Sequence, residues 1–165
     1  MRLDYLLKRE EFDSNFEKTL NKFLSEAYKS NYSVKWKRGI SSNECFLVNS
    51  KLNAIYSRNI DRVDLKNIVS EYSYHQNFLR RLLQRTYVKL ASNIYFERLF
   101  IKNRVEVDTW DKDFDRLCII PGNHSIRFIN LESSTCKVVL KEGFDRDFIT
   151  NEVNLRKDNT FLSTP

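Results

Sequence analysis

Apolar residues recur at helical spacing near the start of the chain. Six of them follow one another at intervals of four, four, three, one and three residues, namely Phe12, Phe16, Leu20, Phe23, Leu24 and Ala27. This pattern is typical of the buried face of an amphipathic helix. It predicts a helix from about residue 9 to residue 28.

A second helical pattern runs from residue 61 or 62 to residue 100, with no glycine or proline inside it. It predicts one long helix or two nearly continuous helices. A single helix of about 35 to 40 residues would be about 55 Å long, which is too long for one side of a small globular domain. Either residues 3–7 and the first helix cover this segment, or it docks on a partner. A second copy of the chain, in a homodimer, is one such partner.

Strand patterns are found in both halves of the chain. In the first half, residues 44–56 are rich in β-branched and aromatic residues, with Asn49 and Ser50 at the place of a turn. This pattern predicts a small β-hairpin. In the second half, three short apolar runs are separated by turn residues, and they lie at 117–120, 125–130 and 135–140.

These three runs predict a three-stranded antiparallel sheet. A short helix is expected to follow it, from about residue 145 to residue 157. The fold class is therefore α+β: a helical N-terminal module with a small hairpin, then a three-stranded sheet and one helix.

Charge divides the chain at about residue 104. The chain carries 28 Lys and Arg against 22 Asp and Glu, a formal net charge of +6. The first 100 residues hold 18 basic and 11 acidic residues, a balance of +7, and the other 65 hold 10 and 11, a balance of −1. An acidic run follows the change, made up of Glu106, Asp108, Asp111, Asp113 and Asp115. We therefore expect a basic, mainly helical module over residues 1–104 and a second unit over residues 105–165.

Composition excludes several kinds of site. Three glycines and two prolines in 165 residues leave no Gly-rich phosphate loop. The three cysteines form no C-x-x-C pair, which argues against a disulfide framework and a zinc site. The N-terminus lacks the apolar core of a secretory signal, and no stretch approaches 18 apolar residues. We expect a cytoplasmic protein with no membrane span and no metal ligands.

The third predicted strand of the second half carries a lysine at its end. Side chains alternate across a strand, so Lys137, Val139 and Lys141 share one face. A lysine at the end of a buried strand loses hydration, and a paired carboxylate is the expected way to keep it charged. Glu152, eleven residues later, could reach back to Lys141. If both side chains are exposed instead, such an ion pair contributes less than about 1 kcal/mol to the free energy of unfolding.

Residues 117–165 resemble the nucleotide-binding lobe of protein-kinase-like phosphotransferases. The resemblance depends on the order of the strands and on two short segments, Val138-Val139-Leu140-Lys141 and Asn151-Glu152-Val153. The closest likeness is to the aminoglycoside-phosphotransferase type, including kinase-like proteins associated with bacterial cell-surface polysaccharides.

The resemblance implies a role for each of these residues. Lys141 would anchor the phosphates of ATP, Glu152 would be its ion-pair partner, and Val139 would roof the adenine. Residues 120–125 would take the place of the turn that covers the phosphates, where His124 could donate to an anion. The acceptor would be a small or carbohydrate substrate.

The chain also departs from this family. The turn at 121–125 has a single glycine, and no His-x-Asp with a downstream Asn or later Asp-Phe-Gly is present to supply a catalytic carboxylate and magnesium ligands. On its own, the chain is not expected to transfer phosphate, and magnesium would bind only with a catalytic lobe. It is either the first part of a longer kinase-like enzyme or a stand-alone module that kept the lobe for binding.

The basic half supports an alternative hypothesis, a non-enzymatic module that binds nucleic acid or an acidic protein. Trp36 lies among Lys35, Lys37 and Arg38, where an exposed indole could stack on a base. The predicted long helix carries four further cations, Arg80, Arg81, Arg85 and Lys89. A stripe of cations would bind phosphates, although such runs are more often solvated helix faces.

Overall fold

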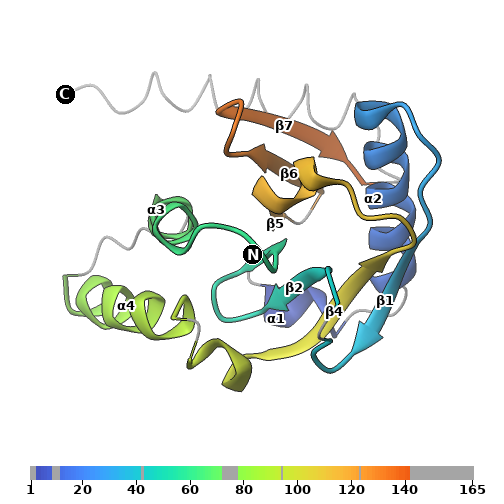
Figure 1. Ribbon diagram of the computed structural model, residues 1–165. Coiled ribbons are helices and arrows are strands. Elements are labelled where there is room, and N and C mark those ends of the chain that lie inside the picture. Colours follow the sequence, from blue (N-terminus) through green and yellow to red (C-terminus); the bar gives the residue numbers. More distant parts are fainter. Residues whose placement is uncertain are drawn as a thin grey trace, which may run out of the picture.

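The computed structural model describes residues 3–8, 12–41, 43–71, 78–93, 95–122 and 124–141 (Figure 1). The helices are α1 (Leu3–Leu6), α2 (Phe12–Tyr28), α3 (Arg62–Glu71) and α4 (Phe78–Ala91), with 3-10 turns η1 (Glu97–Leu99) and η2 (Lys112–Arg116). The strands are β1 (Val34–Arg38), β2 (Phe46–Asn49), β3 (Ala54–Ser57), β4 (Ile101–Val107), β5 (Leu117–Pro121), β6 (Ser125–Asn130) and β7 (Thr135–Leu140). The predicted α+β class is confirmed. The helix predicted at 145–157, with Glu152, lies outside the described residues.

The seven strands of the described residues form one antiparallel sheet in the order β1-β4-β2-β3-β5-β6-β7. The predicted meander is present as β5, β6 and β7, but the prediction of a three-stranded sheet is wrong. The sheet continues because β3 pairs with β5, with Tyr56 opposite Cys118. Residue 104, the predicted boundary, lies inside β4, and strands from both sides of it share the sheet.

Helix α2 lies on one face of the sheet and contacts both of its edge strands, β1 and β7 (Figure 1). One helix can touch two strands at opposite ends of the strand order only if the sheet curves around it. The right-handed twist of antiparallel strands produces such curvature. The buried residues of α2 are Phe12, Phe16, Thr19, Leu20, Phe23 and Leu24. The predicted apolar face is therefore confirmed as far as Leu24, whereas Ala27 is exposed.

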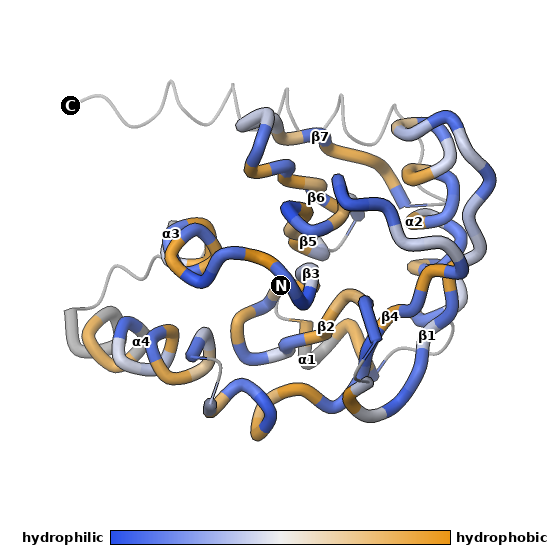
Figure 2. The backbone as a smooth tube through the Cα atoms, in the orientation of Figure 1, coloured by the Kyte–Doolittle hydropathy of each residue, from blue (hydrophilic) through white to orange (hydrophobic). Residues whose placement is uncertain are grey.

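Helices α3 and α4 lie against the other face and contact each other. Their buried residues Leu65, Val69, Val88 and Ala91 form a second apolar cluster with Leu47, Tyr56 and Ile120 of the sheet. Figure 2 shows hydrophobic positions along β2, β5, β6 and β7, whereas α4 alternates between hydrophobic and hydrophilic positions.

Of the segment predicted as one long helix or two, the described residues form α3, with 10 residues, and α4, with 14, and the segment ends in a 3-10 turn rather than in helix. The start of α3 is fixed by Asp61, whose carboxylate accepts the N–H groups of Val63 and Asp64 at 2.8 and 3.0 Å. Because α3 and α4 pack on each other and on the sheet, their length alone does not call for a partner. Within the described part of the chain, none of the helices combines the length and apolarity that crossing a bilayer demands.

Candidate functional site

Lys141 follows directly after β7, at the edge of the face that α2 covers. The residue is only 8% exposed. Its backbone N–H donates to the carbonyl oxygen of His124 at 3.0 Å, which holds the strand end beside the β5–β6 turn. Its ammonium nitrogen lies 5.1 Å from the centre of the Phe12 ring. The lysine is therefore buried, next to the predicted phosphate turn, and directed at α2.

The backbone geometry of that turn explains why its residue 122 is a glycine. The N–H of Gly122 donates to the carbonyl oxygen of Ser125 at 2.8 Å. A Cβ at position 122 would come within 2.7 Å of the same oxygen, so a side chain there would displace the backbone. Since this N–H already has a partner in the chain, the turn offers fewer free donors to a phosphate than a Gly-rich loop does.

Helix α2 covers the lysine face of β7 with aromatic rings. Phe23 stacks on Phe128 with ring centres 3.6 Å apart, and the ammonium of Lys137 lies 5.5 Å from the Phe23 ring. Val139, the predicted adenine roof, is partly buried against the same cluster. The predicted nucleotide face is thus in contact with a helix whose position there could not be anticipated from the sequence pattern.

Trp36 lies on the same side of the sheet as Lys141, although the two were predicted for different functions. Its ring makes edge contacts with Phe12 and Phe16, with centres 6.0 and 5.6 Å apart, and its backbone N–H donates to the carboxylate of Glu17. Phe12 therefore contacts both Trp36 and Lys141. A half-buried indole held in this way does not present a free face to a base.

The cations of the alternative hypothesis lie on the opposite side of the sheet, on α4. Arg85 and Lys89 are exposed there, whereas the side chains of Arg80 and Arg81 are outside the described part. Exposed leucines accompany them, with Leu82 52% and Leu83 71% exposed. The structure does not bring Trp36 and the α4 cations together into one surface.

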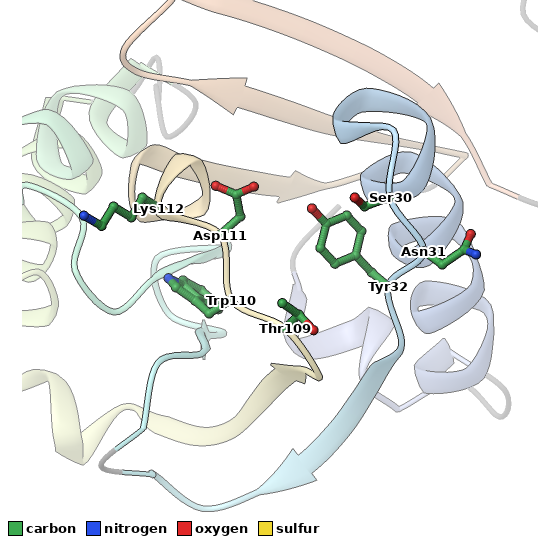
Figure 3. A pocket seen from close by; sticks show the side chains of 7 residues that line it. All are labelled: Ser30, Asn31, Tyr32, Thr109, Trp110, Asp111 and Lys112. Carbon is green, nitrogen blue, oxygen red and sulfur yellow. The ribbon is translucent and has the colours of Figure 1, made fainter.

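A pocket of about 500 Å³ lies between the segment that follows α2 and the segment between β4 and η2 (Figure 3). Its lining residues are Ser30, Asn31, Tyr32, Thr109, Trp110, Asp111 and Lys112. No prediction from the sequence included this pocket, because the acidic run indicated only a boundary. Trp110 beside Tyr32 could not be foreseen either, since they are 78 positions apart in the chain.

A buried polar network joins the sheet to α3, α4 and η1. Glu97 accepts two hydrogen bonds from the guanidinium of Arg62, at 2.7 and 3.0 Å, and one from the hydroxyl of Tyr56 at 3.3 Å. The side-chain amide of Asn49 donates to the Tyr56 hydroxyl and to the carbonyl oxygen of Ala91. Burial, with the Glu97 charge beside it, raises the pKa of Tyr56 well above its usual range, so this hydroxyl stays protonated.

Comparisons of the chain with protein-family models, with curated proteins and with solved structures found no match. Function is therefore inferred from the chain's own residues.

Proposed function

We propose that the β5–β6–β7 unit binds the phosphate groups of a nucleotide such as ATP through Lys141, as the nucleotide-binding part of a kinase-like phosphotransferase. The observation that carries this proposal is the position of Lys141, buried at the end of β7 and hydrogen-bonded through its backbone to His124 in the turn. A buried ammonium beside a strand turn is the arrangement that a phosphate-anchoring lysine needs.

The contact between Lys141 and Phe12 is compatible with phosphate binding on energetic grounds. A cation–π contact contributes about 0.5–2 kcal/mol. A hydrogen bond between charged partners contributes about 1.5–3 kcal/mol, and a phosphate offers several acceptor oxygens. A phosphate can therefore offer the ammonium stronger interactions than the ring of Phe12 does.

The residues fit phosphate better than they fit magnesium. Lys141 supplies the positive charge that a phosphate requires, but the described residues contain no group of three or more His, Cys, Asp or Glu side chains that could hold a metal ion. The sequence also lacks the His-x-Asp loop of the family. The proposed role is therefore binding, with transfer to a small or carbohydrate acceptor only in combination with a catalytic lobe.

A thermal-unfolding titration of the chain with ATP and magnesium tests this proposal. ATP at ten times its dissociation constant would stabilise the folded state by about 1.4 kcal/mol, which raises Tm by about 3–6 °C in a chain of this size. We expect this increase in the parent chain and its loss in Lys141→Met, which keeps the aliphatic stem.

Lys137→Met is the matched control, because Lys137 lies two residues before Val139 on the same face and its ammonium also contacts a phenylalanine of α2. It should respond to ATP as the parent does. No increase in the parent chain, or equal increases in both variants, would contradict nucleotide binding at Lys141.

A second candidate function, docking of an acidic partner, is favoured by the composition of α4. Its sequence from Phe78 to Ala91 holds three arginines and one lysine and no acidic residue. We expect salt-dependent retention on an anionic polymer, and its loss when Arg80, Arg81 and Arg85 are changed to Ala. Equal retention of this variant and the parent would contradict the candidate.

A further inference from the structure

We infer that the pocket between Tyr32 and Trp110 binds a neutral, hydroxyl-rich ligand, a single sugar ring or a polyol. Its volume of about 500 Å³ lies within the range of small-molecule sites, about 300–1,000 Å³. The lining combines two aromatic rings with hydroxyl groups and one carboxylate.

The walls of this pocket are held in place before any ligand arrives. The backbone N–H of Asp108 donates to the carbonyl oxygen of Ser33 at 3.0 Å, and the Asp108 carboxylate accepts the N–H of Ser33 at 2.9 Å. These two bonds tie the segment after α2 to the segment after β4. A preformed site avoids the entropy cost of ordering loops when the ligand binds.

Both aromatic walls are braced by the same core residue. The rings of Tyr32 and Trp110 make edge contacts with Phe114, with centres 5.2 and 5.4 Å apart. The indole N–H of Trp110 donates to Asp115 at 2.9 Å, which fixes the ring further. A fixed indole offers a flat apolar surface for the C–H face of a sugar ring.

The polar groups of the pocket match a ligand that both donates and accepts hydrogen bonds. Figure 3 shows the hydroxyls of Ser30 and Tyr32 and the carboxylate of Asp111 directed toward the same side, whereas Asn31 and Lys112 point away. Within the described residues, no protein group hydrogen-bonds to the side-chain hydroxyls of Ser30, Tyr32 or Thr109. Hydroxyl groups act as donor and acceptor at once, so they suit the hydroxyls of a sugar.

Charge argues against an anionic ligand at this place. Asp111 lines the pocket, Asp108 and Asp113 are next to lining residues in the chain, and Lys112 points away (Figure 3), so a phosphate would be repelled. A bare cation is also less suitable, because one oxygen of each carboxylate, Asp108 and Asp111, already accepts backbone N–H groups and is less available as a ligand. Of the three classes of ligand, anionic, cationic and neutral, a neutral one fits the charges around the pocket best.

This pocket is separate from the lysine of the proposed function. Lys141 contacts Phe12 at the first residue of α2, and the pocket begins two residues after the helix ends. A helix of 17 residues is about 25 Å long. Sugar binding here and nucleotide binding at Lys141 can therefore be tested, and can fail, independently.

The test is an NMR titration that follows the indole N–H signal of Trp110, assigned with a Trp36→Phe variant. The probes are glucose, galactose, mannose, N-acetylglucosamine and glycerol, with inorganic phosphate and ethanolamine as charged comparisons. We expect a saturable shift with at least one neutral probe and none with the charged ones. Tyr32→Phe and Ser30→Ala, which each remove a hydroxyl that faces the pocket, should each weaken binding about fivefold.

Ser70→Ala, which removes an exposed hydroxyl on α3, is the control and should bind as the parent does. The inference is overturned if no neutral probe gives a saturable shift, or if phosphate or ethanolamine gives the shift instead. It is also overturned if Tyr32→Phe and Ser30→Ala, each with a folded NMR spectrum, bind the sugar as tightly as the parent.

Discussion

The two faces of the sheet are held to their helices by different means. On the α2 face, buried contacts join apolar and aromatic side chains, with Phe23 stacked on Phe128 and Phe16 against Trp36. On the α3–α4 face, an apolar cluster surrounds the hydrogen-bonded chain from Asn49 to Arg62 through Tyr56 and Glu97. The packing of α2 on the sheet depends on the fit of apolar side chains, whereas the packing of α3 and α4 depends also on paired charges.

This difference determines how each face tolerates change. Truncating an apolar side chain destabilises a core in proportion to the volume of the cavity that remains. A buried polar group that is deprived of its partner keeps the full cost of its own desolvation. Substitutions that preserve shape should therefore be mild on the α2 face and severe in the polar network.

The largest effect is expected from Phe16→Ala on the α2 face. Phe16 is 1% exposed and contacts Phe12 and Trp36. Removing its ring leaves a cavity, and we expect the free energy of unfolding to fall by about 3–5 kcal/mol. Chemical denaturation measures it, and Glu26→Ala, an exposed change on the same helix, should have little effect. A decrease in Phe16→Ala no larger than in the control would mean that α2 is not packed as described.

Glu97→Gln sharpens the comparison on the other face, because it changes charge and leaves shape nearly intact. The guanidinium of Arg62 would no longer face a carboxylate, while its side chain stays three-quarters buried. We expect the free energy of unfolding to fall by about 2–3 kcal/mol, which is less than for a fully buried pair because Arg62 is partly solvated.

Glu132→Gln is the matched control for that variant. Its pair with Arg116 spans 3.9 Å, and both side chains are about 60% exposed, so the change should cost less than about 1 kcal/mol. Changing Arg62 and Glu97 together to Met and Leu should recover part of the stability, because no charge is then left unpaired. If Glu97→Gln lowers the free energy of unfolding no more than the control does, the network does not stabilise the packing of α3 and α4 on the sheet.

The same contrast explains which parts of the fold could be predicted from sequence. The period of Phe12 to Ala27 and the three apolar runs of the second half predicted α2, β5, β6 and β7, because a single buried face imposes a regular spacing. Strand β4 was missed, although Ile101 and Val105 are buried within it. Its remaining positions are mostly charged or polar, and only pairing with β1 and β2 makes it a central strand.

Sites were harder to predict than elements. Lys141 was singled out because it lies at a predicted strand end, and the structure places it, buried, directly after β7; its role in phosphate binding stays a prediction. The contact with Phe12, the Arg62–Glu97 pair and the pocket at Trp110 join residues 35 or more positions apart. The spacing of residues along one chain does not show which distant residues meet in the fold. Homologous sequences in which both members of a pair change together would show it.

Alkaline pH should destabilise the fold through a buried acid on the α3–α4 face. Cys118, on the α3–α4 face, is fully buried, and desolvation raises the pKa of its thiol from 9.0 to about 12. The unfolded chain releases this proton near pH 9 while the folded chain keeps it, so the stability contributed below pH 9 is lost as pH rises toward 12. The slope approaches about 1.4 kcal/mol per pH unit.

Denaturation midpoints between pH 8 and 10.5 measure this slope. Cys118→Ala should flatten the profile, whatever its effect at neutral pH, and Cys136→Ala should not, because Cys136 is exposed. The thiol of Cys136 should also react with an aromatic disulfide in the folded protein while Cys118 stays protected. An unchanged slope in Cys118→Ala would assign the alkaline destabilisation to Cys45 and Tyr56, two further buried acids of that face whose pKa burial raises.

The smallest effect is expected at Lys137, which, like Lys141, brings a positive charge against the largely apolar α2 face. Lys137 is exposed, and its ammonium lies 5.5 Å from the ring of Phe23; exposed cation–π contacts contribute about 0.5–1 kcal/mol. A double-mutant cycle of Lys137→Ala with Phe23→Leu should give a coupling of about 0.5 kcal/mol, while Lys35→Ala with Phe23→Leu should give none. A coupling near ~2 kcal/mol would exceed that range. Electrostatic interactions would then also stabilise the packing of α2 on the sheet. The two faces would differ only in how much such interactions contribute.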